Sequence, residues 1–343
     1  MTIDSGSDAA VLDRKALSAF FDRHVPEFGG SMEVEPIFGG RSNLVYDVSD
    51  GIHHWILRRP PLGLVAPSAN DIGREYRVVE ALGPTSVPVA RAIAYCDDTG
   101  VIGAPFSVVS KVDGRVIRTA ADGAALDPVD AGAIAEALVV GLVAVHAVLY
   151  HDVGLGELGR PKGFLERQVS RWKSQWDHVA TRDLPEIDRL HKGLIAATPD
   201  ESDATIVHGD YRLDNTILDR LDPTTLSAIV DWEMATIGDP LADLGLLLVY
   251  WDPVCAGILP EGHAIGANAG FPPMEQVADL YSNLSGRGLD RLAFYRALGY
   301  FKLAVIAEGI HNRFREGLTV GGGFETVGDA VTPLLHAGLR MVD

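Results

Sequence analysis

One segment of the chain concentrates polar side chains that could take part in catalysis. Residues 206–219 read IVHGDYRLDNTILD, in which an apolar run ends in His208-Gly209-Asp210 and Asn215 follows five residues after the aspartate. A short apolar run bounded by turn residues is typical of a strand, so we expect Asp210 just beyond a strand end. A carboxylate in such a place can orient a hydroxyl group and accept its proton.

A second segment adds two acidic side chains. Residues 226–230 form another short apolar run, and Asp231-Trp232-Glu233 follow it directly. Phosphoryl transfer needs a carboxylate base together with Mg²⁺ ligands, and Mg²⁺ prefers carboxylate and amide oxygens. Asp and Asn also favour ordinary turns, which is the alternative interpretation of each residue taken singly. The two segments taken together favour phosphoryl transfer.

These motifs resemble the catalytic and metal-binding segments of aminoglycoside phosphotransferases and of related choline and homoserine kinases. The likeness includes Gly238-Asp239-Pro240 and Asp243-Leu244-Gly245 and extends over residues 33–317. It implies a protein-kinase-like α+β fold, with a small N-terminal antiparallel-sheet lobe and a larger, mainly helical C-terminal lobe. It also implies that the chain uses ATP and Mg²⁺ to phosphorylate a hydroxyl group of a small molecule.

The resemblance assigns chemical roles to individual side chains. Asp210 would be the catalytic base. Arg212 would reach the transferring phosphate, and a plain salt bridge is its alternative interpretation. Three further side chains would hold magnesium: Asn215, Asp231 and, for a second ion, Glu233.

Two other residues of the motifs would support the catalytic loop without touching the substrate. They are His208, directly before the glycine of the loop, and Asp243, at the start of a predicted helix. For His208 the alternative is a buried, hydrogen-bonded core histidine, which is close to the same interpretation.

A glycine pair lies between two predicted strands early in the chain. The segment FGGRSN, residues 38–43, could fold over nucleotide phosphates and offer them backbone N–H groups and a serine hydroxyl. A simple hairpin is the alternative. The chain contains no GK[ST] sequence, which excludes a lysine-bearing P-loop. The candidates for nucleotide binding here are Gly39, Gly40, Ser42 and Asn43.

A basic residue on the third predicted strand is expected to belong to the nucleotide site. Protein kinases carry a lysine there and pair it with a glutamate of the next helix. The strand HHWILRRPP has Arg58 at this place, and Glu75 in GREYRV is the expected partner. Arg59 is the rival, although strand alternation turns it to the opposite face. By the same resemblance to kinases, the backbone near Ser110 and Val112 would hold the adenine.

The elements that position these residues change in type along the chain. Strands are predicted at 32–38, 43–48, 53–58, 89–95 and 105–112, with helices at 13–24 and 72–82, the latter capped by Ser68 or Asn70. Apolar spacing of three and four predicts later helices at 128–149, 164–179, 186–196, 241–250, 274–285, 289–316 and 326–339. We therefore expect a nucleotide-binding lobe over residues 1–112. Residues 113–343 would form a helical lobe with the catalytic and metal-binding loops and the acceptor pocket.

Composition restricts the partners of this protein. The net charge of -18 argues against nucleic acid and anionic membrane surfaces as partners. The apolar stretches 131–150 and 243–251 are expected to be core helices, and the polar N-terminal sequence lacks the apolar core of a signal peptide. Cys96 and Cys255 are too far apart to suggest a disulfide framework or a zinc site. A cytoplasmic protein is the expectation.

Two classes of acceptor remain open. Excess acid would suit a cationic, aminoglycoside-like acceptor. The sequences ILRRPP, PSAN and REYRV resemble the phosphotransferase domain fused to some acyl-CoA dehydrogenases, which implies a hydroxyacyl thioester or related hydroxy acid, and we prefer this class. A nucleotide-binding regulatory protein with the kinase fold and little catalysis is the alternative function, because Arg58 departs from the usual lysine. A protein kinase is disfavoured, since residues 232–240 are too short for an activation segment.

Overall fold

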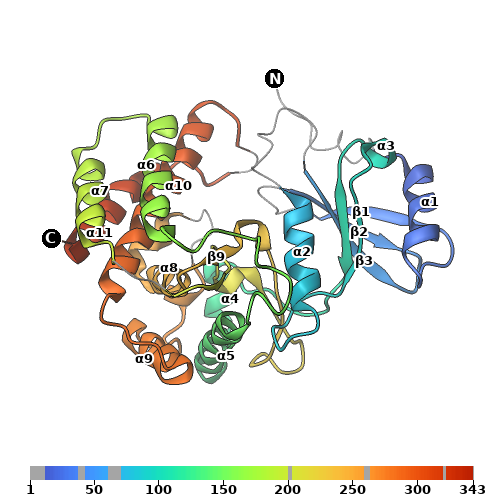
Figure 1. Cartoon of the computed structure of the whole chain (residues 1–343), viewed down its shortest axis with the longest axis horizontal. Helices are drawn as coiled ribbons and strands as arrows, with labels where there is room; N and C mark the ends of the chain where they lie inside the picture. Colours follow the sequence, from blue (N-terminus) through green and yellow to red (C-terminus); the bar gives the residue numbers. More distant parts are fainter. Residues whose placement is uncertain are drawn as a thin grey trace. The chain divides into compact units, whose positions relative to one another are not determined.

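The computed structural model describes residues 12–37, 43–60, 71–199, 203–258, 263–319 and 322–342. The chain forms two compact units (Figure 1), the first made of Met1–Asp113 with Ala228–Glu233, and the second of Gly114–Ser227 with Met234–Asp343. The sequence placed the 228–233 segment in the second lobe. The structure corrects this assignment, because the backbone N–H of Ile229 donates to the carbonyl of Pro88 at 2.8 Å within the first unit.

A five-stranded antiparallel sheet forms the centre of the first unit. Its order is β1-β2-β3-β5-β4, with β1 Glu33–Ile37, β2 Leu44–Ser49, β3 His54–Arg59, β4 Ala92–Cys96 and β5 Phe106–Ser110. These are the five strands that the sequence predicted, each slightly shorter or shifted. The turn predicted at Asp50-Gly51 joins β2 to β3, and Gly51 has a φ of +91°, a left-handed conformation that glycine adopts without a Cβ penalty.

Helices pack on both faces of this sheet. The odd residues of β3 face α1 (Arg14–His24), where Phe21 meets Trp55 with ring centroids 5.7 Å apart. The even residues face α2 (Ile72–Leu82), which presents Glu75 to Arg58. The sequence did not predict the short helix α3 (Thr99–Ile102). Asp71 caps α2 through the N–H of Arg74. This corrects the predicted cap, and Ser68 and Asn70 lie outside the described residues.

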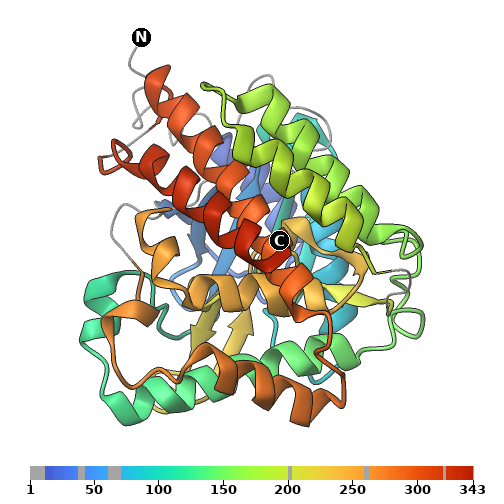
Figure 2. The same cartoon turned by 90° about the vertical axis from the view of Figure 1, so that its left-hand side faces the viewer.

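The second unit is mainly helical. Its α-helices are α4 Ala120–Ala124, α5 Pro128–Ala147, α6 Phe164–Val179, α7 Pro185–Ala197, α8 Leu241–Trp251, α9 Met274–Ser285, α10 Leu292–Arg315 and α11 Val331–Val342. The predicted bounds of α6 and α9 are those observed, whereas the region predicted as one helix at 326–339 is a 3₁₀ turn, Val327–Ala330, followed by α11. Among the described residues, α10 packs against α6, α7, α8 and α11 (Figure 2). This arrangement buries Tyr300, Phe301 and Leu334 completely.

Short strands interrupt the helices and carry the polar motifs. Strand β6 (Thr205–Val207) pairs antiparallel with β9 (Thr236–Gly238), and the sequence did not predict β9. Strand β7 (Thr216–Leu218) follows a 3₁₀ turn, and β8 (Leu226–Ile229) begins in the second unit and ends in the first. Each strand is only three or four residues long, so the polar residues that follow lie close to strand ends, as expected.

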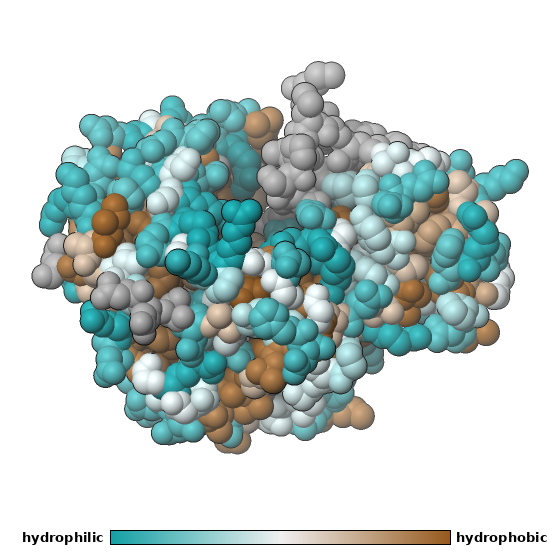
Figure 3. Space-filling model, viewed as in Figure 1, coloured by the Kyte–Doolittle hydropathy of each residue, from teal (hydrophilic) through white to brown (hydrophobic). Residues whose placement is uncertain are grey.

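Helix α5 is, among the described helices, the one that is long and apolar enough to cross a membrane by length and composition. Its contacts are those of a core helix, since it packs against α9 and β6 and buries Ile134, Leu138 and Leu142 completely. Hydrophilic residues predominate on the face drawn in Figure 3, where the apolar patches are small and scattered. This surface agrees with the high net charge.

Candidate active site

The loop after β6 is held by one buried carboxylate. Asp243, in the first turn of α8, accepts a hydrogen bond from the backbone N–H of His208 at 2.6 Å and another from that of Gly209 at 2.8 Å. Gly209 has a φ of +83°, which lets the chain turn sharply before Asp210. The structure thus places Asp243 where the sequence expected a support for the loop. His208 contributes through Nδ1, which accepts from the N–H of Asp210 at 3.2 Å.

Asp243 is itself fixed by two residues that the sequence analysis did not single out. Its Oδ2 lies 3.3 Å from Nε2 of His146, and Nδ1 of the same ring lies 2.8 Å from the hydroxyl of Tyr281. Burial opposes ionisation of Asp243, but the hydrogen bonds from His146 and from the N–H of Gly209 favour the carboxylate, and the pKa of Asp243 lies below its usual range. Burial lowers the pKa of His146. A carboxylate hydrogen-bonded to a neutral imidazole therefore anchors the loop that carries Asp210.

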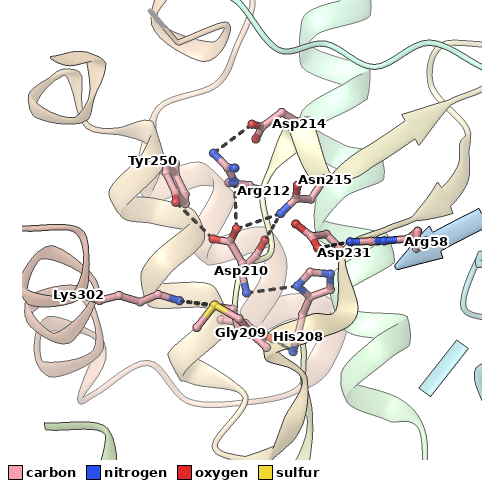
Figure 4. Close-up of polar contacts among 12 residues, drawn as sticks. Arg58, His208, Gly209, Asp210, Arg212, Asp214, Asn215, Asp231, Tyr250 and Lys302 are labelled. Carbon is pink, nitrogen blue, oxygen red and sulfur yellow. Dashed lines mark hydrogen bonds and ion pairs between the residues drawn. The ribbon is translucent and has the colours of Figure 1, made fainter. Parts of the chain in front are cut away.

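The carboxylate of Asp210 is surrounded by donors (Figure 4). Its Oδ1 accepts from the hydroxyl of Tyr250 at 3.3 Å, and its Oδ2 accepts from Nδ2 of Asn215 at 3.1 Å. Nε of Arg212 lies 3.3 Å from the same Oδ2, and the Asp210 side chain remains 21% exposed. The carboxylate is therefore positioned from several sides and still partly open to a substrate.

Charge near Asp210 decides its protonation. Burial raises the pKa of the carboxyl, but the cations Arg212 and Lys302 outweigh burial and lower it below the ordinary aspartate value. Asp210 is therefore ionised at neutral pH, as a group that accepts a proton from a hydroxyl must be.

Lys302 on α10 is a residue that the sequence analysis missed. It is 7% exposed, and its ammonium donates to the carbonyl of Gly209 and lies 5.4 Å from the ring centroid of Trp172. Burial lowers the pKa of Lys302, and the charge of Asp210 opposes this shift. The available signal was a lone lysine within the apolar stretch LGYFKLAVIA, because a lysine is almost never buried without partners.

Arg212 forms the salt bridge that the sequence left as an alternative. Besides Asp210 it pairs with Asp214, with Nη1 3.0 Å from Oδ2, and its guanidinium lies 5.4 Å from the ring centroid of Tyr250. A contact with a transferring phosphate stays a prediction.

The amide of Asn215 is oriented in a way that suits a metal ligand. Its nitrogen donates to the carbonyl and to the carboxylate of Asp210, at 2.8 Å and 3.1 Å. These bonds turn the amide nitrogen toward Asp210 and the carbonyl oxygen away from it, and an oxygen is the donor atom that Mg²⁺ takes.

In the first unit, Arg58 joins two acidic residues, of which Figure 4 labels Asp231. Its Nη1 lies 2.5 Å from Oε1 of Glu75, the predicted partner, and its Nη2 lies 3.1 Å from Oδ1 of Asp231. Burial favours the neutral guanidine, but Glu75 and Asp231 raise the pKa of Arg58. Burial raises the pKa of Glu75, and Arg58 partly offsets that effect. Arg59 points to the opposite face, where it donates to the carbonyl of Ile102 at 3.1 Å.

Carboxylates of the 228–233 segment supply further oxygen atoms. Asp231 has a φ of +68° and a side chain 34% exposed, so its second oxygen can reach a ligand. Nδ2 of Asn43 donates to Oε2 of Glu233 at 3.4 Å. Two carboxylates so close in the chain fit the hard-oxygen preference of Mg²⁺. The joint binding of one ion by Asn215, Asp231 and Glu233 stays a prediction.

The remaining candidates for nucleotide binding divide into two groups. Gly39, Gly40 and Ser42 lie outside the described residues. The backbone N–H of Ser110 donates to the carbonyl of Arg91 at 2.9 Å. In return, the hydroxyl of Ser110 accepts from the backbone N–H of Arg91. The backbone donor of Ser110 is thus used within the first unit, which moves the expected adenine contact toward Val112.

Comparison with known proteins identifies the family. The profile of the phosphotransferase enzyme family matches residues 33–280, which is most of the chain. The chain belongs to this family. The resemblance found in the motifs, to a family of small-molecule kinases, is confirmed.

Sequence relatives are longer proteins. The chain is 33% identical over 337 residues to human acyl-CoA dehydrogenase family member 11, and this match covers 96% of the chain and 43% of the relative. It is 32% identical over 287 residues to mouse acyl-CoA dehydrogenase family member 10, covering 83% of the chain and 27% of the relative. The chain therefore spans less than half the length of these relatives.

Solved structures agree with this assignment. A Ralstonia eutropha structure assigned to the aminoglycoside phosphotransferases is 31% identical, with a TM-score of 0.83 over 96% of this chain and 98% of that one. Choline kinase from Cryptosporidium parvum has a TM-score of 0.67 at 12% identity, over 96% and 95% of the two chains. Aminoglycoside 2'-phosphotransferase-IIIa, solved with GDP, has a TM-score of 0.62 at 15% identity, over 96% and 99%. The last two show the fold alone, which is the predicted protein-kinase-like fold.

Proposed function

We propose that this phosphotransferase transfers the γ-phosphate of ATP, with Mg²⁺, to a hydroxyl group of a small molecule, and that Asp210 is its catalytic base. The observation that supports this most directly is the carboxylate of Asp210. It is ionised, held by Asn215 and Tyr250, and placed on a loop that Asp243 anchors. Such pre-positioning of a base costs no reorganisation during the reaction.

The proposed reaction assigns a separate role to each residue of the site. Asp210 would accept a hydrogen bond from the acceptor hydroxyl and take its proton as the bond from the acceptor oxygen to the γ-phosphorus forms and the bond from that phosphorus to ADP breaks, with ADP as the leaving group. Bound ATP would supply the phosphoryl group, and Mg²⁺ would neutralise its charge. Arg58, fixed by Glu75, would present its guanidinium to the nucleotide phosphates, which an arginine can bind through two N–H groups.

We propose a hydroxyacyl thioester or a related hydroxy acid as the acceptor. Relatives named for acyl-CoA dehydrogenases support this choice, and so do the two cations, Arg212 and Lys302, whose charges act on Asp210. An amino sugar is the second candidate, because a neighbour at 31% identity is assigned to the aminoglycoside phosphotransferases.

Acceptor-dependent release of ADP in the presence of Mg²⁺ tests this function. The screen would compare 3-hydroxybutyryl-CoA and 4-hydroxybutyryl-CoA with kanamycin and choline. We expect turnover with a hydroxyacyl thioester, and we expect Asp210→Asn and Asp231→Ala to abolish it while circular dichroism and the melting temperature stay near those of the wild type. Asp188→Asn, at a side chain 62% exposed on α7, is the matched control.

Two outcomes would contradict the proposal. Full activity of Asp210→Asn would refute its role as the base. ATP binding, seen as a rise in melting temperature, without turnover of any acceptor would favour the regulatory alternative.

A further inference from the structure

His263 is a buried polar side chain with no hydrogen-bond partner in the described part of the chain. It is 8% exposed, and neither Nδ1 nor Nε2 forms a hydrogen bond there. Leaving a buried donor or acceptor unsatisfied is destabilising, because the group loses its hydrogen bonds to water and gains none in return. A site that keeps such a group in place is therefore explained most simply by a ligand that satisfies it.

The surroundings of His263 connect it to the catalytic base. Its ring stacks on Tyr250, with centroids 5.6 Å apart and an interplanar angle of 23°. The hydroxyl of Tyr250 donates to Oδ1 of Asp210 at 3.3 Å, and the guanidinium of Arg212 lies over the Tyr250 ring. One aromatic ring thus contacts the unpartnered imidazole, the arginine and the carboxylate that would activate the acceptor.

The imidazole is neutral at physiological pH. Burial, and then the charge of Arg212, lower the pKa of His263 to about 4. A neutral imidazole offers one N–H donor and one nitrogen acceptor. The chemistry that this pair recognises is an uncharged polar group, such as a carbonyl or a second hydroxyl. An ammonium group would meet the unfavourable charge of Arg212.

We propose that His263 binds the acceptor directly, by a hydrogen bond from its ring to an uncharged polar group near the hydroxyl that Asp210 deprotonates. Tyr250 is then a positioning residue that holds both His263 and Asp210. This inference rests on the proposed function and refines it, since it favours an acceptor with a carbonyl or hydroxyl group over one with an amine beside the reacting hydroxyl.

Three variants test the proposal by kinetics. His263→Phe keeps an aromatic ring against Tyr250 and removes both nitrogens, so KM for 3-hydroxybutyryl-CoA or 4-hydroxybutyryl-CoA should rise about tenfold or more, while KM for ATP stays unchanged. His263→Gln restores a donor and an acceptor and should recover part of the loss. His336→Phe, at a histidine 52% exposed on α11, should match the wild type.

A spectroscopic readout separates this inference from the proposed function. In protein labelled with ¹⁵N-histidine, the ring signals of His263, assigned by their loss in His263→Gln, should shift when the hydroxyacyl-CoA is added without nucleotide, and should not shift with choline. A shift without ADP release would leave the His263 inference standing and overturn the proposed function. Turnover with an unchanged acceptor KM in His263→Phe and no shift would overturn the inference alone. No shift and no turnover with any probe would overturn both.

Discussion

The ammonium group of Lys302 donates a hydrogen bond to the backbone carbonyl of Gly209, the residue directly before Asp210. The contact joins two residues 93 positions apart, from α10 and from the loop after β6. It brings a positive charge close enough to lower the pKa of the Asp210 carboxyl. One buried lysine therefore supports the catalytic loop and, together with Arg212, keeps its base ionised.

Lys302→Met should shift the pH dependence of catalysis. Burial raises the pKa of Asp210 and the cations Arg212 and Lys302 depress it, so removing one of the two cations raises that pKa. The acid limb of kcat/KM should move to higher pH. Separately, kcat at neutral pH should fall about tenfold, because the catalytic loop loses the hydrogen bond that Lys302 donates to the carbonyl of Gly209. A pH–rate profile measures both, with Lys192→Met, an exposed lysine of α7, as the control. An acid limb at the wild-type position would show that Lys302 does not tune Asp210.

Gly209→Ala should be more damaging than the same change at Gly286. Both glycines have positive φ, +83° and +71°, so each alanine costs about 1–2 kcal/mol of backbone strain. A Cβ at Gly209 would also lie 2.7 Å from the carbonyl oxygen of Met234, whereas nothing lies within 4 Å of one at Gly286. For Gly209→Ala alone we expect the free energy of unfolding to fall by about 1–3 kcal/mol more, and turnover to be reduced. Urea denaturation and ADP release measure these effects, and equal losses at the two sites would contradict the steric argument.

Arg58→Met should destabilise the protein by leaving Glu75 buried and unpaired. The cost is about 3–5 kcal/mol for a buried pair that loses one partner, and Arg58→Lys should lose less because it keeps one ion pair. Glu75 already has a raised pKa, and in Arg58→Met that pKa rises further. Stability lost in this way is greatest at neutral pH and is partly regained as pH falls through the raised pKa of Glu75.

A double variant checks that explanation. Arg58→Met with Glu75→Gln removes the buried charge and should recover part of the free energy of unfolding at neutral pH. If the double variant is as unstable as Arg58→Met, packing and not charge explains the loss.

The stability of the protein should fall between about pH 6.5 and pH 4. His263 has a folded-state pKa of about 4 against an ordinary value of 6.5, so the unfolded chain binds a proton that the folded chain does not. The contribution of neutral His263 to stability is therefore fully present above the ordinary histidine pKa. It is lost as pH falls toward the folded-state pKa of His263, by about 3 kcal/mol at most. His146, whose pKa burial also lowers, adds to the same loss of stability at acidic pH.

Urea denaturation across this pH range measures the effect. His263→Phe should show a shallower loss than the wild type, since the group that titrates is removed and the charged neighbour Arg212 remains. If the free energy of unfolding falls with pH equally steeply in His263→Phe and in the wild type, His263 is not the group responsible for this loss.

Much of the fold followed from local patterns in the sequence. Apolar spacing placed α6 and α9 at their observed bounds, and the five strands of the first unit were all predicted. Strand alternation also placed Arg58 and Arg59 on opposite faces of β3, with Arg58 beside Glu75. These features depend on residues close in the chain, whose backbone preferences and periodicity are readable without coordinates.

Tertiary structure decided which side chains surround Asp210 and how they are charged. Lys302 and Tyr250 reach it from α10 and α8, His263 reaches it through Tyr250, and the 228–233 segment packs with the first unit. The sequence by itself determined the motif, the family resemblance and the elements that carry them. Only the packed structure decided the burial, the partners and the protonation of the residues between those elements, because desolvation and charge depend on neighbours that are distant in the chain.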